Sequence, residues 1–328
     1  MNKSQTKEGR GFFYSLCLLC FLFSILCFTG CGRGREYPAN QVPQSIEKIC
    51  KEESEISVTA RVVGKTAGAL IVIDSLLDST GQVPKEVHEQ MGKVMQAVTR
   101  VALSTDLAID FCVVSVRDRA QGNELSITRS VDDTRRANAD ALGIEESMNR
   151  TLFSQNKVPL TSVETFVLKE VTLENFLAEQ IAQRIRLNYS HDTIADEASA
   201  KPFMLVDGNF VHSEKHRTFR FSILSLKSED PKAMVMDMFK TAGFVLRDYD
   251  FKGFDGMEIQ DYMNRQKLVV NRQTIFDYQN HKIKDEDILK KFLVESSSIQ
   301  DAFKLFGFAA PQESSSPAAA PASTPSTS

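Results

Sequence analysis

The order of predicted strands and helices constrains the fold of this chain more than any other feature of its sequence. Short β-branched and aromatic runs alternate with helical periodicity in the order β-β-α-β-β-α, and this order occurs twice. The helix after Pro84 places its apolar side chains four and three residues apart, on one face. The predicted strands are residues 56–63, 67–73, 109–116 and 125–131 in the first series, and 202–211, 218–226, 257–262 and 268–271 in the second. The pattern predicts an α+β fold with antiparallel sheets covered by helices.

Further segments complete each series. Thr172 and Asp230 are predicted to cap helices over residues 172–189 and 230–246. A short strand is expected at residues 165–171. The remaining predicted helices are residues 132–142, 145–153, 274–280, 285–295 and 298–306.

The two series also match residue by residue when the sequence is aligned with itself at an offset of 143 positions. At this offset Met91 meets Met234 and Asp118 meets Asp261. Helical and strand faces stay in phase, so the match predicts an internal duplication. The alternative is that two α+β segments give such matches by chance, because the offset was chosen for its score.

The first thirty residues have the three parts of a secretory signal peptide. Residues 1–10 carry three basic side chains and one acidic side chain, and residues 11–28 are almost wholly apolar. The segment ends in Phe28-Thr29-Gly30-Cys31. This motif resembles the lipobox of bacterial lipoprotein precursors, in which a bulky apolar residue and two small residues precede the cysteine. The resemblance covers residues 1–31 only, and Phe28 stands where that family usually has Leu.

The resemblance implies a cellular location, at a membrane outside the cytoplasm, and implies no activity. Precursors of that family are cleaved before the cysteine, which then carries acyl chains, so Cys31 is the expected lipidation site and membrane contact. The rest of the chain would then fold outside the cytoplasm. Gly32 in place of Asp favours the outer membrane if the cell is Gram-negative. The alternative is an uncleaved transmembrane anchor, because the apolar run is close to the shortest that spans a bilayer.

Composition divides the chain into five regions. The tether and the tail have too few apolar side chains to form a core. The predicted regions are residues 1–30, a signal peptide; 31–45, a tether; 46–160, the first α+β unit; 161–308, the second α+β unit; and 309–328, a disordered tail of Pro, Ala, Ser and Thr.

The charge of the processed chain argues against one class of partner. Loss of the leader removes three basic residues and one acidic residue, which changes the formal charge from −4 to −6. Binding to nucleic acid without sequence preference requires a basic surface. We therefore expect no nucleic-acid partner.

Two cysteines remain after the leader and Cys31 are set aside. Cys50 and Cys112 are permitted to form a disulfide in an oxidising compartment. The favoured alternative is a buried thiol at Cys112, inside a predicted strand, and an exposed thiol at Cys50. Two cysteines alone cannot form a zinc site.

No catalytic or cofactor motif is complete. Gly64-Lys65-Thr66 lacks the earlier glycine of a phosphate-binding loop and lies between two strands, so it is predicted as a hairpin turn. Ser154 and Lys157 have the spacing of penicillin-binding enzymes without the companion motifs. We expect no cofactor.

Two partial metal motifs are equally weak. His212 and His216 are four residues apart, but their segment is predicted as a turn, not a helix. Asp248 and Asp250 occupy the first and third positions of a calcium loop whose fifth position is Lys252. A lysine among the ligands opposes a divalent cation, so no metal site is predicted.

Aromatic residues gather near the end of one predicted helix and in the connection after it. A Phe-rich core would account for them, and the alternative is a groove for a peptide or a lipid chain. The candidate groove residues are Phe239, Phe244, Tyr249, Phe251 and Phe254.

The sequence favours a membrane-anchored envelope lipoprotein that acts as a non-catalytic binding or assembly factor. Its expected partners are the membrane, through lipid on Cys31, and other envelope proteins. Two alternatives stay open, which are a carrier of a small ligand or lipid and an envelope hydrolase with an unrecognised site.

Overall fold

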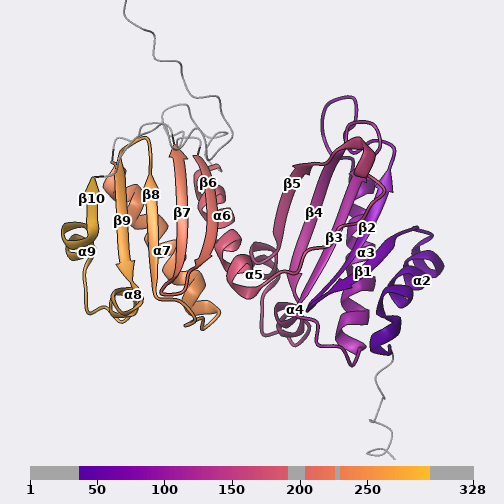
Figure 1. The fold of residues 1–328 in the computed structure, drawn as a ribbon, viewed down its shortest axis with the longest axis horizontal. Helices are drawn as coiled ribbons and strands as arrows, with labels where there is room; N and C mark the ends of the chain where they lie inside the picture. The colour runs from indigo at the N-terminus through magenta and orange to yellow at the C-terminus, as the bar shows by residue number, and fades with distance from the viewer. Residues whose placement is uncertain (1–36, 191–203, 226–229, 296–328) are drawn as a thin grey trace, which may run out of the picture. The chain divides into compact units, whose positions relative to one another are not determined.

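The computed structural model describes residues 37–190, 204–225 and 230–295, which form two compact units (Figure 1). The units divide between Val171 and Thr172, and each contains one five-stranded sheet with helices, so the fold class is α+β. Within the described ranges, no helix combines the length and the apolar character needed to cross a bilayer. The predicted leader, Cys31, the helix at 298–306 and the tail lie outside the described residues.

The first unit forms a sheet with the strand order β1-β2-β3-β4-β5. Its neighbouring strands are antiparallel except β2 and β3, which are parallel, with Thr66 opposite Phe111. The elements are η1 (Ala39–Gln41), α2 (Val42–Ser54), β1 (Thr59–Val63), β2 (Thr66–Ile73), α3 (Lys85–Ser104), β3 (Phe111–Asp118), β4 (Asn123–Ser130), α4 (Val131–Asn138), α5 (Ile144–Asn149), β5 (Leu152–Lys157) and η2 (Leu160–Ser162).

The second unit forms a sheet with the order β10-β9-β8-β7-β6. Here β7 and β8 are the parallel pair and the other neighbours are antiparallel. The elements are α6 (Leu173–Ser190), β6 (Met204–His212), β7 (Arg217–Ser225), α7 (Pro231–Asp248), β8 (Gly256–Asp261), β9 (Gln266–Asn271), α8 (Arg272–Gln279), α9 (Asp285–Phe292) and β10 (Leu293–Glu295).

The sheets are therefore mixed, whereas the sequence predicted antiparallel pairing throughout. In each unit a helix connects two hairpins, α3 in the first and α7 in the second. Because the helix returns the chain to the end of the sheet at which the preceding strand began, the two strands that it joins run in the same direction. The hairpins themselves are antiparallel, as expected.

The two units share one order of elements, α-β-β-α-β-β-α-α-β, and the same sense of pairing at each step. They also share a backbone contact beside the parallel pair. The carbonyl oxygen of Lys65 accepts the N–H of Asp110 at 2.8 Å, and that of Arg217 accepts the N–H of Asp255 at 2.7 Å. The same side chains form ion pairs in both units. Descent from one duplicated unit stays a prediction.

The core of the first unit lies between the sheet and the helices α2 and α3, which cover one face of it (Figure 1). The five helical positions predicted to share a face in α3 are buried: Val87, Met91, Val94, Val98 and Val101. The helix α2 begins at Val42, whose side chain is fully buried. The chain is thus already folded within the segment expected to be a tether, 31–45.

The opposite face of the first sheet is covered by residues 163–171, where a strand was predicted at 165–171. No strand forms there. Phe166 and Leu168 instead pack on Leu70, and the N–H of Val171 donates to Thr66 Oγ1 at 2.8 Å. The alternating apolar pattern was therefore real, but its side chains contact the face of a sheet and its backbone does not extend the sheet. This packing also explains why the unit ends at Val171 and not at the predicted residue 160.

Other boundaries differ from the prediction by local effects. The helix expected at 145–153 ends at Asn149, and the chain continues as the edge strand β5. The helices begin where predicted at Thr172, which accepts the N–H of Asn175, and at Asp230, which accepts the N–H of Ala233. Gly64 lies in the left-handed region with φ +53°, as its place in the hairpin turn requires.

Candidate functional site

The structure separates the five predicted groove residues into three environments. Phe254 is buried beside Phe219 of β7, with ring centroids 5.5 Å apart, and Phe251 packs on both rings. Tyr249 donates its hydroxyl hydrogen to Gln180 Oε1 at 3.0 Å. These three aromatic residues are part of the packing of the second unit.

Phe239 and Phe244 instead line a pocket of about 550 Å³ in the second unit. Its floor is apolar and its rim is polar. The residues that line it are Phe239, Lys240, Gly243, Phe244 and Arg247 of α7; Ile275, Tyr278 and Gln279 of α8; and His281, Ile283, Lys284, Asp285 and Glu286 of the α8–α9 connection and the start of α9. Only the α7 part of this pocket was singled out by the sequence.

Hydrogen bonds fix the walls of the pocket. Gln279 Nε2 donates to the carbonyl oxygen of Gly243 at 2.7 Å, which ties α8 to α7. Asp285 accepts from the Tyr278 hydroxyl at 2.8 Å and forms an ion pair with Lys240 Nζ at 2.7 Å. The ring of Phe239 meets that of Tyr278 edge to face at 5.0 Å. The pocket is therefore built before any ligand arrives.

The titratable groups of the wall are poorly suited to proton transfer near neutral pH. Hydrogen bonds from Lys240 and Tyr278 lower the pKa of Asp285, so it stays ionised. Burial, together with the hydrogen bond to Asp285, raises the pKa of Tyr278 to about 12. A general acid or base works best with a pKa near the operating pH. The arrangement favours binding.

The rim presents an aromatic ring between cations. Phe244 is 43 % exposed, and the guanidinium carbons of Arg184 and Arg247 lie 5.5 and 5.7 Å from its ring centroid. Lys284 is also exposed on the rim. Neither Arg247 nor Lys284 forms an ion pair with a carboxylate in the described part of the chain. An anionic ligand with an apolar group would match both parts of this surface.

The other sequence candidates do not converge on a site. His212 and His216 are exposed at the β6–β7 turn, where Ser213 Oγ donates to the carbonyl oxygen of His216. Asp250 pairs with Lys252 at 2.7 Å. The described residues contain no group of three or more His, Cys, Asp or Glu residues placed to hold a metal ion.

The serine and lysine of the penicillin-binding spacing lie on the edge strand β5. Ser154 is opposite Ser126, and Lys157 is opposite Asn123. Residues three apart on a strand point to opposite faces, so Ser154 and Lys157 cannot act together.

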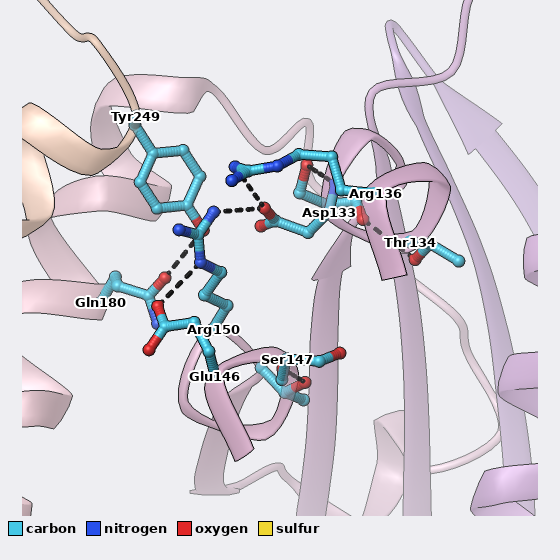
Figure 2. A network of polar contacts seen from close by, with 10 residues as sticks. Asp133, Thr134, Arg136, Glu146, Ser147, Arg150, Gln180 and Tyr249 are labelled. Carbon is cyan, nitrogen blue, oxygen red and sulfur yellow. Dashed lines mark hydrogen bonds and ion pairs between the residues drawn. The ribbon is translucent and has the colours of Figure 1, made fainter. Parts of the chain in front are cut away.

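A buried polar network holds the α4–α5 region of the first unit together (Figure 2). Arg150 is 2 % exposed, and its Nη1 lies 2.7 Å from Asp133 Oδ1 while its Nε donates to Glu146 at 2.8 Å. Asp133 also lies 3.8 Å from Arg136. Each charge in this network has a partner of opposite sign, so its role is structural.

Comparison with known proteins gives no family for this chain. No family model and no curated protein match it. The crystal structure of a sex pheromone staph-cAM373 precursor is 9 % identical, with 72 % of this chain and 78 % of that chain covered and a TM-score of 0.17. A sex pheromone precursor from Lactobacillus salivarius is 10 % identical, with 66 % of this chain and 62 % of that chain covered and a TM-score of 0.19. At these scores the likeness does not establish a shared fold.

Proposed function

We propose that this chain is an exported protein, anchored to a membrane by lipid on Cys31, that binds other proteins of the cell envelope without catalysing a reaction. The leader and the motif that ends at Cys31 support export and lipid anchoring. The pocket of the second unit supports the binding role.

The observation that carries the binding role is the rim of this pocket. Phe244 is exposed between Arg184 and Arg247, above a floor made by Phe239 and Ile275. Aromatic residues and arginine supply most of the energy in protein interfaces because they combine area with directed charge. The matching partner is an acidic peptide segment that carries an apolar side chain.

Crosslinking in intact cells tests the binding role directly. A photoreactive phenylalanine analogue at position 244 should capture a partner, whereas the same analogue at Val269, which is 46 % exposed on β9 of the same unit, should not. Arg247→Glu should abolish the capture, because it reverses the charge beside the ring. Lys232→Glu is the matched control, since Lys232 is exposed on the same helix and does not line the pocket.

Equal capture from positions 244 and 269, or equal effects of the two charge reversals, would exclude this pocket as the binding surface. Lipid anchoring at Cys31 is tested separately. Labelling with a fatty-acid probe should mark the native chain and not Cys31→Ser, and only the native chain should fractionate with membranes.

A carrier of small lipids is the second candidate, favoured by the apolar floor at Phe239 and Ile275. A fluorescent fatty acid would then bind the purified chain and be displaced by Phe244→Ala. Saturable binding of that probe, without a protein crosslink at position 244, would favour the carrier.

A further inference from the structure

A second pocket, of about 390 Å³, lies in the first unit between α3 and α4, above the end of β4. Its apolar part is formed by Met95 and Leu103 of α3. Its polar part includes Arg129 of β4 and Asn138 of α4. None of the described residues that line it is an Asp or a Glu.

Arg129 occupies a position where the strand pattern calls for an apolar residue. It lies on the same face of β4 as Leu125 and Ile127, whose side chains pack against the core under α3. It stands opposite the buried Cys112 in the register of β3 and β4. Burial of its guanidinium lowers the pKa of Arg129. A charge in this place costs free energy unless an anion compensates for it.

Arg129 is partly buried, and two more deeply buried arginines of the same unit show how that compensation is usually made. Arg117 donates to Glu124 at 2.8 Å, and Arg150 lies 2.7 Å from Asp133. Arg129 has no such carboxylate among the described residues. Its Nε donates to the neutral hydroxyl of Thr151 at 3.1 Å, and Nη2 meets the sulfur of Met148 at 4.0 Å.

Other hydrogen-bond donors line the same pocket as this guanidinium. Gln96 and Asn138 each bring a side-chain amide to the wall, and neither amide makes a hydrogen bond to a described residue. Ser104 adds a hydroxyl, and Arg100 adds a second guanidinium, which is paired with Glu53 on the exposed side of α3. The pocket thus offers N–H and O–H groups and positive charge, without a competing carboxylate of its own.

We propose that this pocket binds a small organic ligand through a phosphate or carboxylate group held by Arg129. The planar guanidinium can donate two parallel hydrogen bonds to either oxyanion. The volume of about 390 Å³ is in the range of small-molecule sites, and Met95 and Leu103 would contact the carbon skeleton of the ligand. The oxyanion would supply the negative charge that glutamate and aspartate supply to Arg117 and Arg150.

Calorimetry and thermal unfolding of the full chain with defined probes test this assignment. The probes are glycerol phosphate and inorganic phosphate for the phosphate arm, and citrate and acetate for the carboxylate arm, each against sodium chloride at equal ionic strength. We expect saturable heat and a rise in Tm with at least one arm. Saturation by one arm alone identifies the oxyanion that the pocket selects.

Variants that place a carboxylate in the pocket make the test independent of Arg129 itself. Gln96→Glu and Asn138→Asp change one exposed side chain each and should weaken binding at least about tenfold, because the new carboxylate competes for the guanidinium. Gln44→Glu, on the exposed side of α2, adds the same charge away from the pocket and should leave binding unchanged. Arg129→Lys should also weaken binding, since lysine keeps the positive charge but cannot donate two parallel hydrogen bonds from a planar group.

The proposal is overturned if neither arm exceeds the sodium chloride control. It is equally overturned if Gln96→Glu and Asn138→Asp bind the probes as tightly as Gln44→Glu does.

Discussion

Asp118 and Asp261 hold the same place in their two units, since each ends the strand that follows the connecting helix and accepts N–H groups from the turn after it. Asp118 Oδ1 accepts the backbone N–H groups of Gln121 and Asn123, and Asp261 Oδ1 accepts those of Met263 and Asn264. Each carboxylate also accepts from the side-chain amide of the asparagine in its turn, at 3.1 and 2.7 Å. One local structure therefore closes both hairpins.

The two carboxyl groups nevertheless differ in pKa. Burial tends to raise the pKa of Asp118, but the hydrogen bonds from its turn and from the N–H of Leu76 outweigh it, so the pKa is lowered. Burial dominates at Asp261, which accepts three hydrogen bonds from its turn but none that corresponds to the Leu76 N–H among the described residues, so its pKa is raised. Ionised Asp118 thus stabilises the folded chain, whereas ionisation of Asp261 opposes folding.

The stability of Asp118→Asn and Asp261→Asn should consequently depend on pH with opposite signs. The contribution of Asp118 is present above the ordinary Asp pKa and is lost as pH falls through its lower folded value, so Asp118→Asn should cost about 1–3 kcal/mol at pH 7 and less in acid. The wild-type chain loses stability as pH rises from the ordinary value through the raised pKa of Asp261. The free energy of unfolding of Asp261→Asn, relative to that of the wild type, should therefore be most favourable at neutral pH.

Urea unfolding of both variants and the wild type, followed by circular dichroism between pH 3 and pH 7, measures these differences. A difference in unfolding free energy that changes with pH in the same direction for both variants would contradict this account.

The match between Asp118 and Asp261 was visible in the sequence because local patterns carry over between the units. The amphipathic face of α3, the glycine turn at Gly64 and the caps of α6 and α7 were predictable for the same reason, since each depends on neighbours within a few residues. The parallel pairing of β2 with β3 was not, because it depends on where a helix returns the chain.

The residues of the candidate site also separate into those that local sequence patterns indicated and those that only the folded structure brings together. Phe244 was found because aromatic residues cluster along α7, but Tyr278 and Lys284 were missed, since they join the pocket only when α8 and α9 pack on that helix. The spacing of Ile275, Tyr278 and Gln279 on α8 was a usable signal for a helix face turned toward a neighbour. The strand pattern places Arg129 at an apolar position, but its lack of a carboxylate partner among the described residues is visible only in three dimensions.

Removal of the buried guanidinium of Arg150 should destabilise the first unit strongly (Figure 2). Arg150→Met leaves the carboxylate of Asp133, itself buried, without its closest cation and should cost about 3–5 kcal/mol. Arg136→Met removes a more exposed arginine, 3.8 Å from the same carboxylate, and should cost about 0–1 kcal/mol. Urea unfolding at pH 7 compares them, and equal losses would show that Arg150 does not hold this network.

Substitution by alanine should change the stability of the folded chain in opposite directions at two glycines. Gly92 lies on the exposed side of α3 with nothing within 4 Å of an added Cβ, so Gly92→Ala should stabilise by about 0.5–1 kcal/mol. An added Cβ at Gly208 of β6 would lie 2.5 Å from the carbonyl oxygen of Ala178 and 2.9 Å from Ala182 Cβ, both in α6. Gly208→Ala should therefore destabilise by about 1–3 kcal/mol.

Thermal unfolding of the two alanine variants provides the measurement. A Tm for Gly208→Ala at or above that of the wild type would show that α6 and β6 are not packed as closely as these distances indicate.

Cys50 and Cys112 should be unreactive thiols in the folded chain. Both are free and buried, so the disulfide is absent and the expected exposure of Cys50 was wrong. Cys50 is buried because it shares the inner face of α2 with Val42 and Ile46. Burial, with a smaller contribution from Glu53, raises the pKa of Cys50 to about 11. Burial raises that of Cys112 to about 12, against the hydrogen bond from Thr99.

The thiolate is the reacting form, and at pH 8 it is roughly a thousandth or less of either thiol. In a chain that begins at residue 32, iodoacetamide should therefore modify both cysteines slowly, and urea should make both react fast. Cys50 should react before Cys112, since exposure of Cys50 requires only that α2 detach, whereas Cys112 lies inside the sheet beneath α3. Peptide mass spectrometry after timed quenching gives both rates. In the control variant Cys50→Ala, only the slower reaction of Cys112 should remain. Rapid modification of Cys112 in the folded chain, or a peptide with Cys50 joined to Cys112, would contradict the core described for the first unit.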